Sequence, residues 1–260
     1  MSCRDGRRFV GDRGGYGGRL STTGHFDLNR CFPLSLLVVA AVSLPGAPPV
    51  NAQTPAPPPP AVEKIGDSLF RIGQVTIDAA ARRVSVPGRV NENVMQLEFI
   101  ANTQGGHKSY ESALTMDTSA TSFNAALILI GLDPTHARDV PKFHFDPATP
   151  QGDRVEIWVE CPNHECQRFP AERLMYDKET KQEFSGGGWV YTGSSFVPDG
   201  PYWAELDGVI VGFVHDPASI IEYTGTGALG RFGRIVTNPN LGIKDGTNVV
   251  VVVKALGPAR

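Results

Sequence analysis

Three residues whose types could do chemistry lie close together in ECPNHECQ, residues 160–167. Cys161 and Cys166 are the only cysteines after residue 31, and His164 lies between them. These residue types at this spacing fit a disulfide, a zinc or copper site, or a redox pair of thiols. The three possibilities make different demands on the surrounding chain.

A disulfide is the possibility that the surrounding pattern favours. Residues 154–161 alternate as a strand does, and 162–165 resemble a turn. Cysteines that flank a four-residue loop can face each other across a hairpin at the separation a disulfide needs. Closing so short a loop stabilises a fold by only about 2 kcal/mol in the chain-entropy model. We therefore expect a disulfide that fixes the turn and does not hold the fold together.

The metal alternative uses Cys161, His164 and Cys166 as ligands of zinc or copper. It needs a fourth ligand or an open position, and the remote candidates are His107, His144 and His215. A catalytic redox pair is disfavoured, because such pairs typically form a C-x-x-C motif beside a helix start.

A second group of candidate residues lies in GGHKSYESAL, residues 105–114, which places His107, Lys108, Tyr110 and Glu111 within five positions. A carboxylate near a histidine can tune proton transfer or bind a cation. These four residues are the predicted ligand-binding residues. The alternative is a solvated loop in which Glu111 pairs with Lys108 or another basic side chain.

The N-terminal part predicts export. An uncharged apolar run, residues 32–44, follows Arg30, and Val50-Asn51-Ala52 gives a small-x-small cleavage site. We expect residues 1–52 to be a signal region, with 1–27 either a long leader or a start placed too early. The Pro-rich residues 53–62 predict an extended tether. A periplasmic or secreted protein with no transmembrane span after cleavage is the expectation.

The remainder, residues 63–260, is long enough for one domain with its own core. Residues 1–52 hold six Lys/Arg and three Asp/Glu, which leaves 18 against 24 and a net charge of −6 in the mature part. Without a basic block, nucleic acid is not an expected partner.

Two-residue alternation dominates this domain and predicts strands. The expected strands are 69–78, 82–88, 95–102, 154–161, 187–194, 208–215 and 247–256. One segment has helical periodicity instead, with Ser119 or Thr121 as its cap, Gly131 as its end and Pro134 beyond it. Residues 170–177 and 216–223, the latter capped by Asp216, predict short helices. The fold class is therefore α+β, with antiparallel β predominating.

Several strings together resemble the YdjY-type domain family of bacteria, which is uncharacterised. They are GGHKSYESALTMDTSATSFNAALILIGLDP, DRVEIWVE, PAERLMYDKETKQ, GGGWVYTGSSF and AELDGVIVGFVHDPASIIE. Some relatives are described in connection with iron–sulfur clusters, but such a cluster needs four cysteines and the mature part has two. Many members have a His-Glu pair where this chain has Tyr110-Glu111. The resemblance therefore implies neither a cluster nor that histidine's role.

We expect an exported binding or accessory module for a small ligand, a metal ion or a partner protein of the envelope. The alternative is a metal-dependent or redox accessory enzyme of the envelope that uses Cys161, His164 and Cys166, with Glu111 as acid or base. A third possibility is an interaction module alone.

Overall fold

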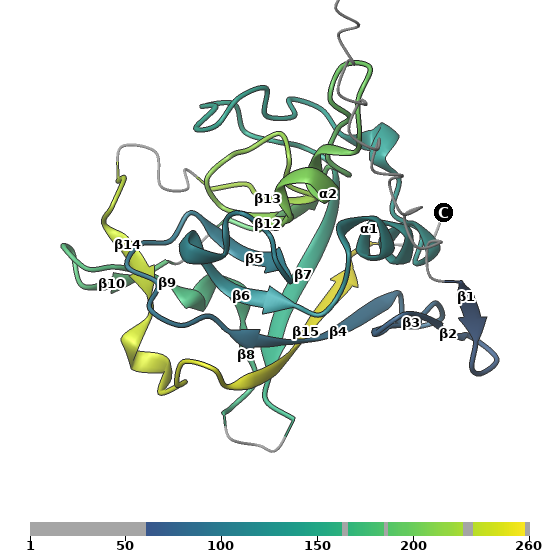
Figure 1. Ribbon diagram of the computed structural model, residues 1–260, viewed down its shortest axis with the longest axis horizontal. Helices are drawn as coiled ribbons and strands as arrows, with labels where there is room; N and C mark the ends of the chain where they lie inside the picture. The colour runs from purple at the N-terminus through teal and green to yellow at the C-terminus, as the bar shows by residue number, and fades with distance from the viewer. Residues whose placement is uncertain (1–60, 163–165, 185–186, 226–230, 258–260) are drawn as a thin grey trace, which may run out of the picture. The chain divides into compact units, whose positions relative to one another are not determined.

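The alternating segments form strands, and eight of them close into a barrel in the computed structural model (Figure 1). The structure describes residues 61–162, 166–184, 187–225 and 231–257. All pairings in the barrel are antiparallel except β12–β13 and β5–β6. The order around the barrel is β4 (Arg83–Val90), β15 (Asn248–Ala255), β7 (Asp153–Glu160), β11 (Trp189–Tyr191), β13 (Ile221–Tyr223), β12 (Val209–Gly212), β5 (Phe99–Thr103) and β6 (Ser112–Met116), which pairs with β4 again.

Further strands extend the barrel. Three of them form an arm that continues the sheet from β4: β1 (Val62–Lys64), β2 (Leu69–Ile72) and β3 (Val75–Asp78). The short β8 (Phe169–Pro170) pairs with β7. A second sheet contains β10 (Gln182–Glu183), β9 (Met175–Asp177) and β14 (Ile235–Thr237).

Two α-helices and four 3-10 turns complete the described chain. They are α1 (Ala120–Leu129), α2 (Trp203–Asp207), η1 (Ser109–Glu111), η2 (Pro134–His136), η3 (Ala171–Leu174) and η4 (Pro239–Leu241). The predicted fold class is confirmed, since strands dominate and helices are minor. Among the described residues, the structure contains no helix with the length and apolar composition of a membrane span. The predicted signal region lies outside the described residues, as does nearly all of the tether.

The barrel closes at β4, which has two different neighbours along one edge. Residues 83–85 pair with β3, and residues 88–90 pair with β6. Pro87 lies between these two pairings and has no amide hydrogen to contribute to either. Its carbonyl oxygen accepts a hydrogen bond from the Asp117 amide at 2.8 Å. The proline therefore sits where the missing donor leaves no ladder bond unmade.

The barrel interior is filled by the alternate residues of its strands, as expected for eight strands. On β7 the face formed by Val155, Ile157 and Val159 is buried, while Glu156 is exposed. The valine run of β15 is largely buried on both faces of the strand, whose two edges pair with β4 and β7. The strands predicted over residues 154–161 and 247–256 are confirmed as β7 and β15.

The predicted helix is confirmed as α1. The Ser119 hydroxyl oxygen accepts from the Ser122 amide at 3.1 Å, which satisfies one of the free donors at the helix start. Gly131, with φ +85°, ends the segment in the left-handed region that favours glycine.

Three local predictions were wrong. Residues 69–78 are not one strand but the hairpin β2–β3, which turns at Gly73 with φ +56°. Residues 170–177 form η3 followed by β9, because the β9 backbone pairs with β10 and β14. Residues 216–223 form a turn and then β13, and the second α-helix is α2 instead.

The close approach of β4 and β6 predicts the effect of one methyl group. A Cβ at Gly88 would overlap the Thr115 carbonyl oxygen and lie 3.2 Å from the Met116 Cα, so Gly88→Ala must push β6 away. We expect the free energy of unfolding to fall by about 1–3 kcal/mol in urea denaturation. The matched control is Gly188→Ala, where the nearest atom is 3.8 Å away. Equal effects of the two substitutions would contradict the tight closure.

Candidate functional site

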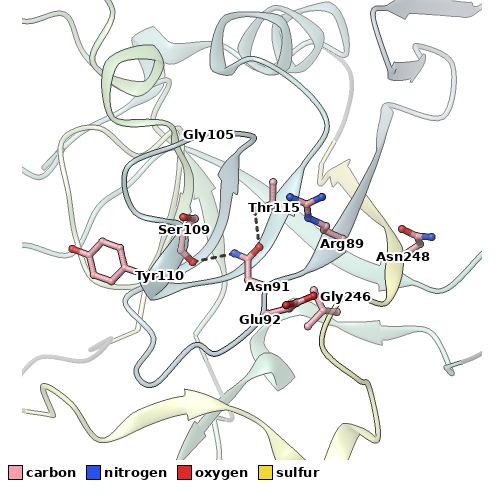
Figure 2. Close-up of a pocket in the computed structure, with 10 residues that line it drawn as sticks. Arg89, Asn91, Glu92, Gly105, Ser109, Tyr110, Thr115, Gly246 and Asn248 are labelled. Atoms are coloured by element: carbon pink, nitrogen blue, oxygen red, sulfur yellow. Dashed lines mark hydrogen bonds between the residues drawn. The ribbon is translucent and has the colours of Figure 1, made fainter.

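A polar cleft opens beside the closure of the barrel (Figure 2). Its volume is about 720 Å³, and β4, η1 and the start of β15 contribute to its walls. The residues that line it are Arg89, Val90, Asn91, Glu92, Gly105, Ser109, Tyr110, Thr115, Gly246 and Asn248. Such a volume is in the range of clefts that hold small molecules.

Asn91 holds the centre of the cleft together. Its side-chain amide donates to the carbonyls of Ser109 (3.2 Å) and Ser112 (2.9 Å), and its carbonyl accepts from the Thr115 hydroxyl (2.6 Å). Figure 2 shows Asn91 between Ser109 and Thr115. These bonds fix η1 against the end of β4, so the base of the cleft is formed in advance of any ligand.

The outer side chains of the cleft are arranged differently. Arg89, Glu92, Tyr110 and Asn248 are exposed, and their side chains make no hydrogen bond or ion pair within the part of the chain that the structure describes. Tyr110 is 61% exposed. In Figure 2 Tyr110 and Arg89 lie on opposite sides of Asn91. A cation, an anion, a phenol and an amide are thus available to a ligand.

Of the four predicted ligand-binding residues, Tyr110 alone lines the cleft. His107 is exposed, and its backbone amide bonds the Asp207 carbonyl at 3.2 Å. The Lys108 ammonium pairs with the Glu111 carboxylate at 3.3 Å, and Glu111 is only 8% exposed. The structure therefore shows the Lys108–Glu111 pairing that the sequence offered as the alternative for this segment. Burial lowers the pKa of Lys108, but Glu111 and Tyr110 outweigh it and the net direction is upward.

Sequence reasoning missed a cluster of two histidines and three carboxylates, formed by His144, His215, Glu98, Asp216 and Glu222. His144 lies between two carboxylates: its Nδ1 is 2.9 Å from Asp216 Oδ2 and its Nε2 is 3.0 Å from Glu98 Oε2. Hydrogen bonds to Asp216 and Glu98 outweigh burial and raise the pKa of His144 to about 9. The ring also packs edge-on against Phe145, with centroids 4.4 Å apart.

This geometry makes His144 a link between two carboxylates rather than a base. We call His144, Glu98 and Asp216 the histidine clamp. At neutral pH both ring nitrogens carry protons and donate them, so neither can accept a proton from a substrate. The two carboxylates bond opposite edges of the ring and do not converge on one ion. No group of three potential metal ligands converges anywhere in the described residues.

A second histidine and carboxylate, His215 and Glu222, lie next to Asp216. His215 Nδ1 is 3.6 Å from Glu222 Oε2, which is longer than a hydrogen bond, and both side chains are buried. Burial lowers the pKa of His215 and raises that of Glu222 well above its usual value. The two directions agree, because a buried pair with no hydrogen bond between its two members is most stable when both are neutral.

Asp216 connects the two pairs. One of its carboxylate oxygens bonds His144, and the other accepts from the Ala218 amide at 2.8 Å, which confirms the predicted cap at this turn. Its own amide donates to Glu222 at 3.1 Å. The capping signal was therefore visible in the sequence, while the second role of the same carboxylate was not.

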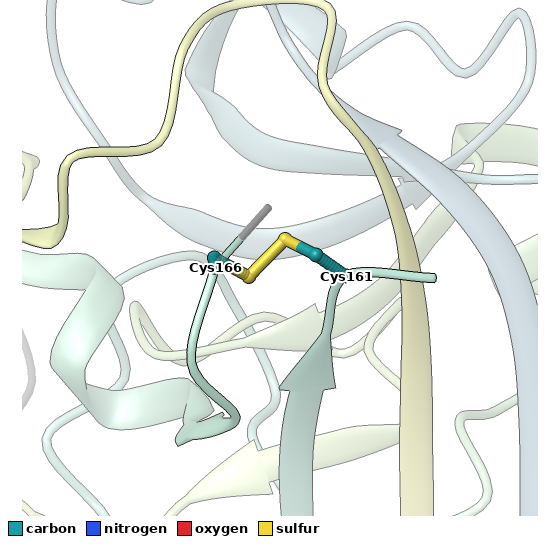
Figure 3. Close-up of a disulfide and its surroundings, with 2 residues drawn as sticks. All are labelled: Cys161 and Cys166. Atoms are coloured by element: carbon teal, nitrogen blue, oxygen red, sulfur yellow. A yellow bond between two sulfur atoms is a disulfide. The ribbon is translucent and has the colours of Figure 1, made fainter. Parts of the chain in front are cut away.

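The cysteine pair forms the predicted disulfide (Figure 3). The sulfurs of Cys161 and Cys166 are 2.01 Å apart, and the Cα atoms are separated by 5.4 Å at the end of β7. The metal alternative needs both sulfurs as thiolates, whereas here they are bonded to each other. His164, its third proposed ligand, lies outside the described residues.

The clamp predicts a pH-dependent stability. His144 has a raised pKa in the folded state, so its contribution is complete below pH 6.5 and is lost as the pH rises through 9. His144→Gln should lower the free energy of unfolding at pH 6 by about 1–2 kcal/mol, since partial exposure screens the interaction. The difference from the unchanged protein, measured by urea denaturation, should shrink at pH 10. An equal difference at both pH values would contradict the charged clamp.

The disulfide predicts a limited loss of stability on removal. The double variant Cys161→Ser, Cys166→Ser should unfold with about 2 kcal/mol less free energy, because the closed loop is short. In the unchanged protein, iodoacetamide under denaturing conditions should label these two cysteines only after reduction. Labelling without reduction would contradict the bond.

No curated protein and no solved structure matches the chain. The family model of the YdjY domain matches residues 75–254, which span the barrel from β3 to β15 and include the cleft, the histidine clamp and the disulfide. The chain therefore belongs to the YdjY domain family.

Proposed function

We propose that this YdjY domain is a non-catalytic binding module of the cell envelope that holds a small polar ligand in the cleft beside η1. The observation that carries the proposal is the contrast between the two sets of cleft residues. Asn91 and Thr115 bond each other and the backbone, while Arg89, Glu92, Tyr110 and Asn248 have no such partners within the described ranges. A pre-formed base with available outer groups suits binding.

The chemistry of the outer groups suggests a class of ligand. The Arg89 guanidinium can bond a carboxylate with two parallel hydrogen bonds. The Asn248 amide and the Tyr110 hydroxyl can both donate to and accept from hydroxyl groups. A small hydroxylated molecule with one carboxylate, such as a sugar acid, uses all three.

Binding is favoured over catalysis because the groups that could transfer protons are committed elsewhere. His144 holds two carboxylates, and Lys108 and Glu111 hold each other. The cleft itself combines no nucleophile with a neighbouring base among its lining residues. The proposed envelope location rests on the signal-like residues 29–52 and on the disulfide, which persists in oxidising compartments.

The proposal is tested by calorimetric titration of the protein with D-glucuronate, D-glucose and citrate. Glucuronate should bind, and Arg89→Ala should weaken it by about 10-fold or more, because a charge-assisted hydrogen bond is lost. Arg83→Ala is the matched control, since Arg83 lies on the same strand with its guanidinium 3.9 Å from Asp78, outside the cleft.

Tyr110→Ala should weaken glucuronate and any measurable glucose binding alike, since the phenol contacts hydroxyls and not the carboxylate. Failure of all three probes to bind would contradict the proposed ligand class. Equal losses in Arg89→Ala and Arg83→Ala would show that the cleft is not where binding occurs.

A further inference from the structure

Residues 139–148, here named the strap, cross the turn between β12 and β13 without joining a sheet. The strap has its own internal bonds: the carboxylate of Asp146 accepts from the amides of Lys142 and Ala148, both at 2.9 Å. Its connections to the barrel are few. The Phe145 amide donates to the His215 carbonyl at 2.9 Å, and the His144 ring bonds Glu98 and Asp216. His144 is thus the main polar attachment of the strap.

The backbone of the strap is strained next to that attachment. Phe145 has φ +63°, a left-handed conformation that bulky residues rarely adopt. The strain persists because the His144 ring on one side and the Phe145 amide on the other are both bonded to the barrel. Loss of the His144 bonds would therefore let the strap relax.

Polar atoms without partners among the described residues lie beside the turn that the strap contacts, in His215 and in Glu222, which accepts from the Asp216 amide. His215 is 7% exposed and Glu222 is fully buried, yet His215 Nδ1 and Glu222 Oε2 have no hydrogen-bond partner among the residues that the structure describes. Buried polar groups of this kind are uncommon in native proteins and call for an explanation. They are costly while covered and can be solvated once uncovered.

We propose that the strap opens in a proton-linked step: it is closed while His144 and Glu222 hold their protons, and it opens as they release them, which uncovers the polar pair His215 and Glu222. The proposal does not depend on ligand binding in the cleft beside η1.

The surrounding charges determine whether rising pH favours the open or the closed strap. His144 faces Asp216 and Glu98, and Glu98 also faces Lys108. Hydrogen bonds to these carboxylates raise the pKa of His144 to about 9 in the closed state. Opening returns it to its ordinary value near 6.5, so between these values one proton is released.

Glu222 acts in the same direction. Burial, together with the nearby Asp216 carboxylate, raises its pKa well above the usual value, and opening lets it ionise. His215 faces Asp146 and Glu222, and burial lowers its pKa, so opening takes up a proton at His215 only in acid. Above pH 6.5 the closed strap therefore binds more protons than the open one, and rising pH favours opening.

The test is hydrogen exchange of the full chain at pH 6.5, 7.5 and 8.5, followed by mass spectrometry of the peptide that contains Phe145 and corrected for intrinsic exchange rates. The opening constant should rise at each step, by at most about 100-fold per pH unit, the limit for two protons released. Amides of β7 should exchange far more slowly than this peptide at each pH, because they are exposed only when the barrel itself unfolds.

Two variants separate the two protons. His144→Gln and Glu222→Gln should each reduce the pH dependence of the opening constant, by a factor of at most about 10 per pH unit, since each removes one titrating group. Asp139→Asn is the control within the strap, because Asp139 accepts from Gln151 and does not contact the histidines. The pH dependence of the opening constant in this variant should match that of the unchanged protein. A pH-independent opening constant in the unchanged protein, which needs no variant to measure, would overturn the proposal. So would an unchanged dependence in either glutamine variant.

Discussion

The double use of one edge of β4 is the constraint on which the rest of the structure depends. The first half of that edge belongs to the arm and the second half to β6, so β4 is the point at which an open sheet becomes a closed barrel. Pro87 makes the change possible, because it needs no partner between the two pairings. Closure then aligns the end of β4 with η1, and the cleft beside Asn91 is a direct result.

The parts of this fold that the sequence predicted are those with local causes. The alternation of Val155, Ile157 and Val159 is a property of one strand, and the Ser119 cap is a property of one helix start. The disulfide likewise depends on a turn of four residues. Where pairing with distant strands decided the outcome, the local pattern gave a wrong prediction. Residues 175–177 were predicted to be helical, but they form β9 because β10 and β14 pair with them.

The candidate site was largely beyond sequence reasoning for the same reason. His144 meets Glu98 and Asp216 across 46 and 72 residues, and only closure of the barrel brings the three together. Only Asp216 had a predicted local role, the cap, and that prediction is confirmed. The cleft residues Arg89, Glu92 and Asn248 belong to no motif. What distinguishes them is that their side chains have no partner among the described residues, which no spacing in the chain can express.

The central place of β15 has a consequence for how the chain acquires its structure. Residues 248–255 lie between β4 and β7, two strands that precede them by more than 80 residues. Until these residues have been synthesised and delivered, β4 and β7 each present an unpaired edge, and the core between them stays open to water. The barrel therefore cannot be completed in step with synthesis from its N-terminal strands. During that interval the incomplete sheet is exposed to wrong pairing, so this protein has reason to depend on chaperones that shield strand edges.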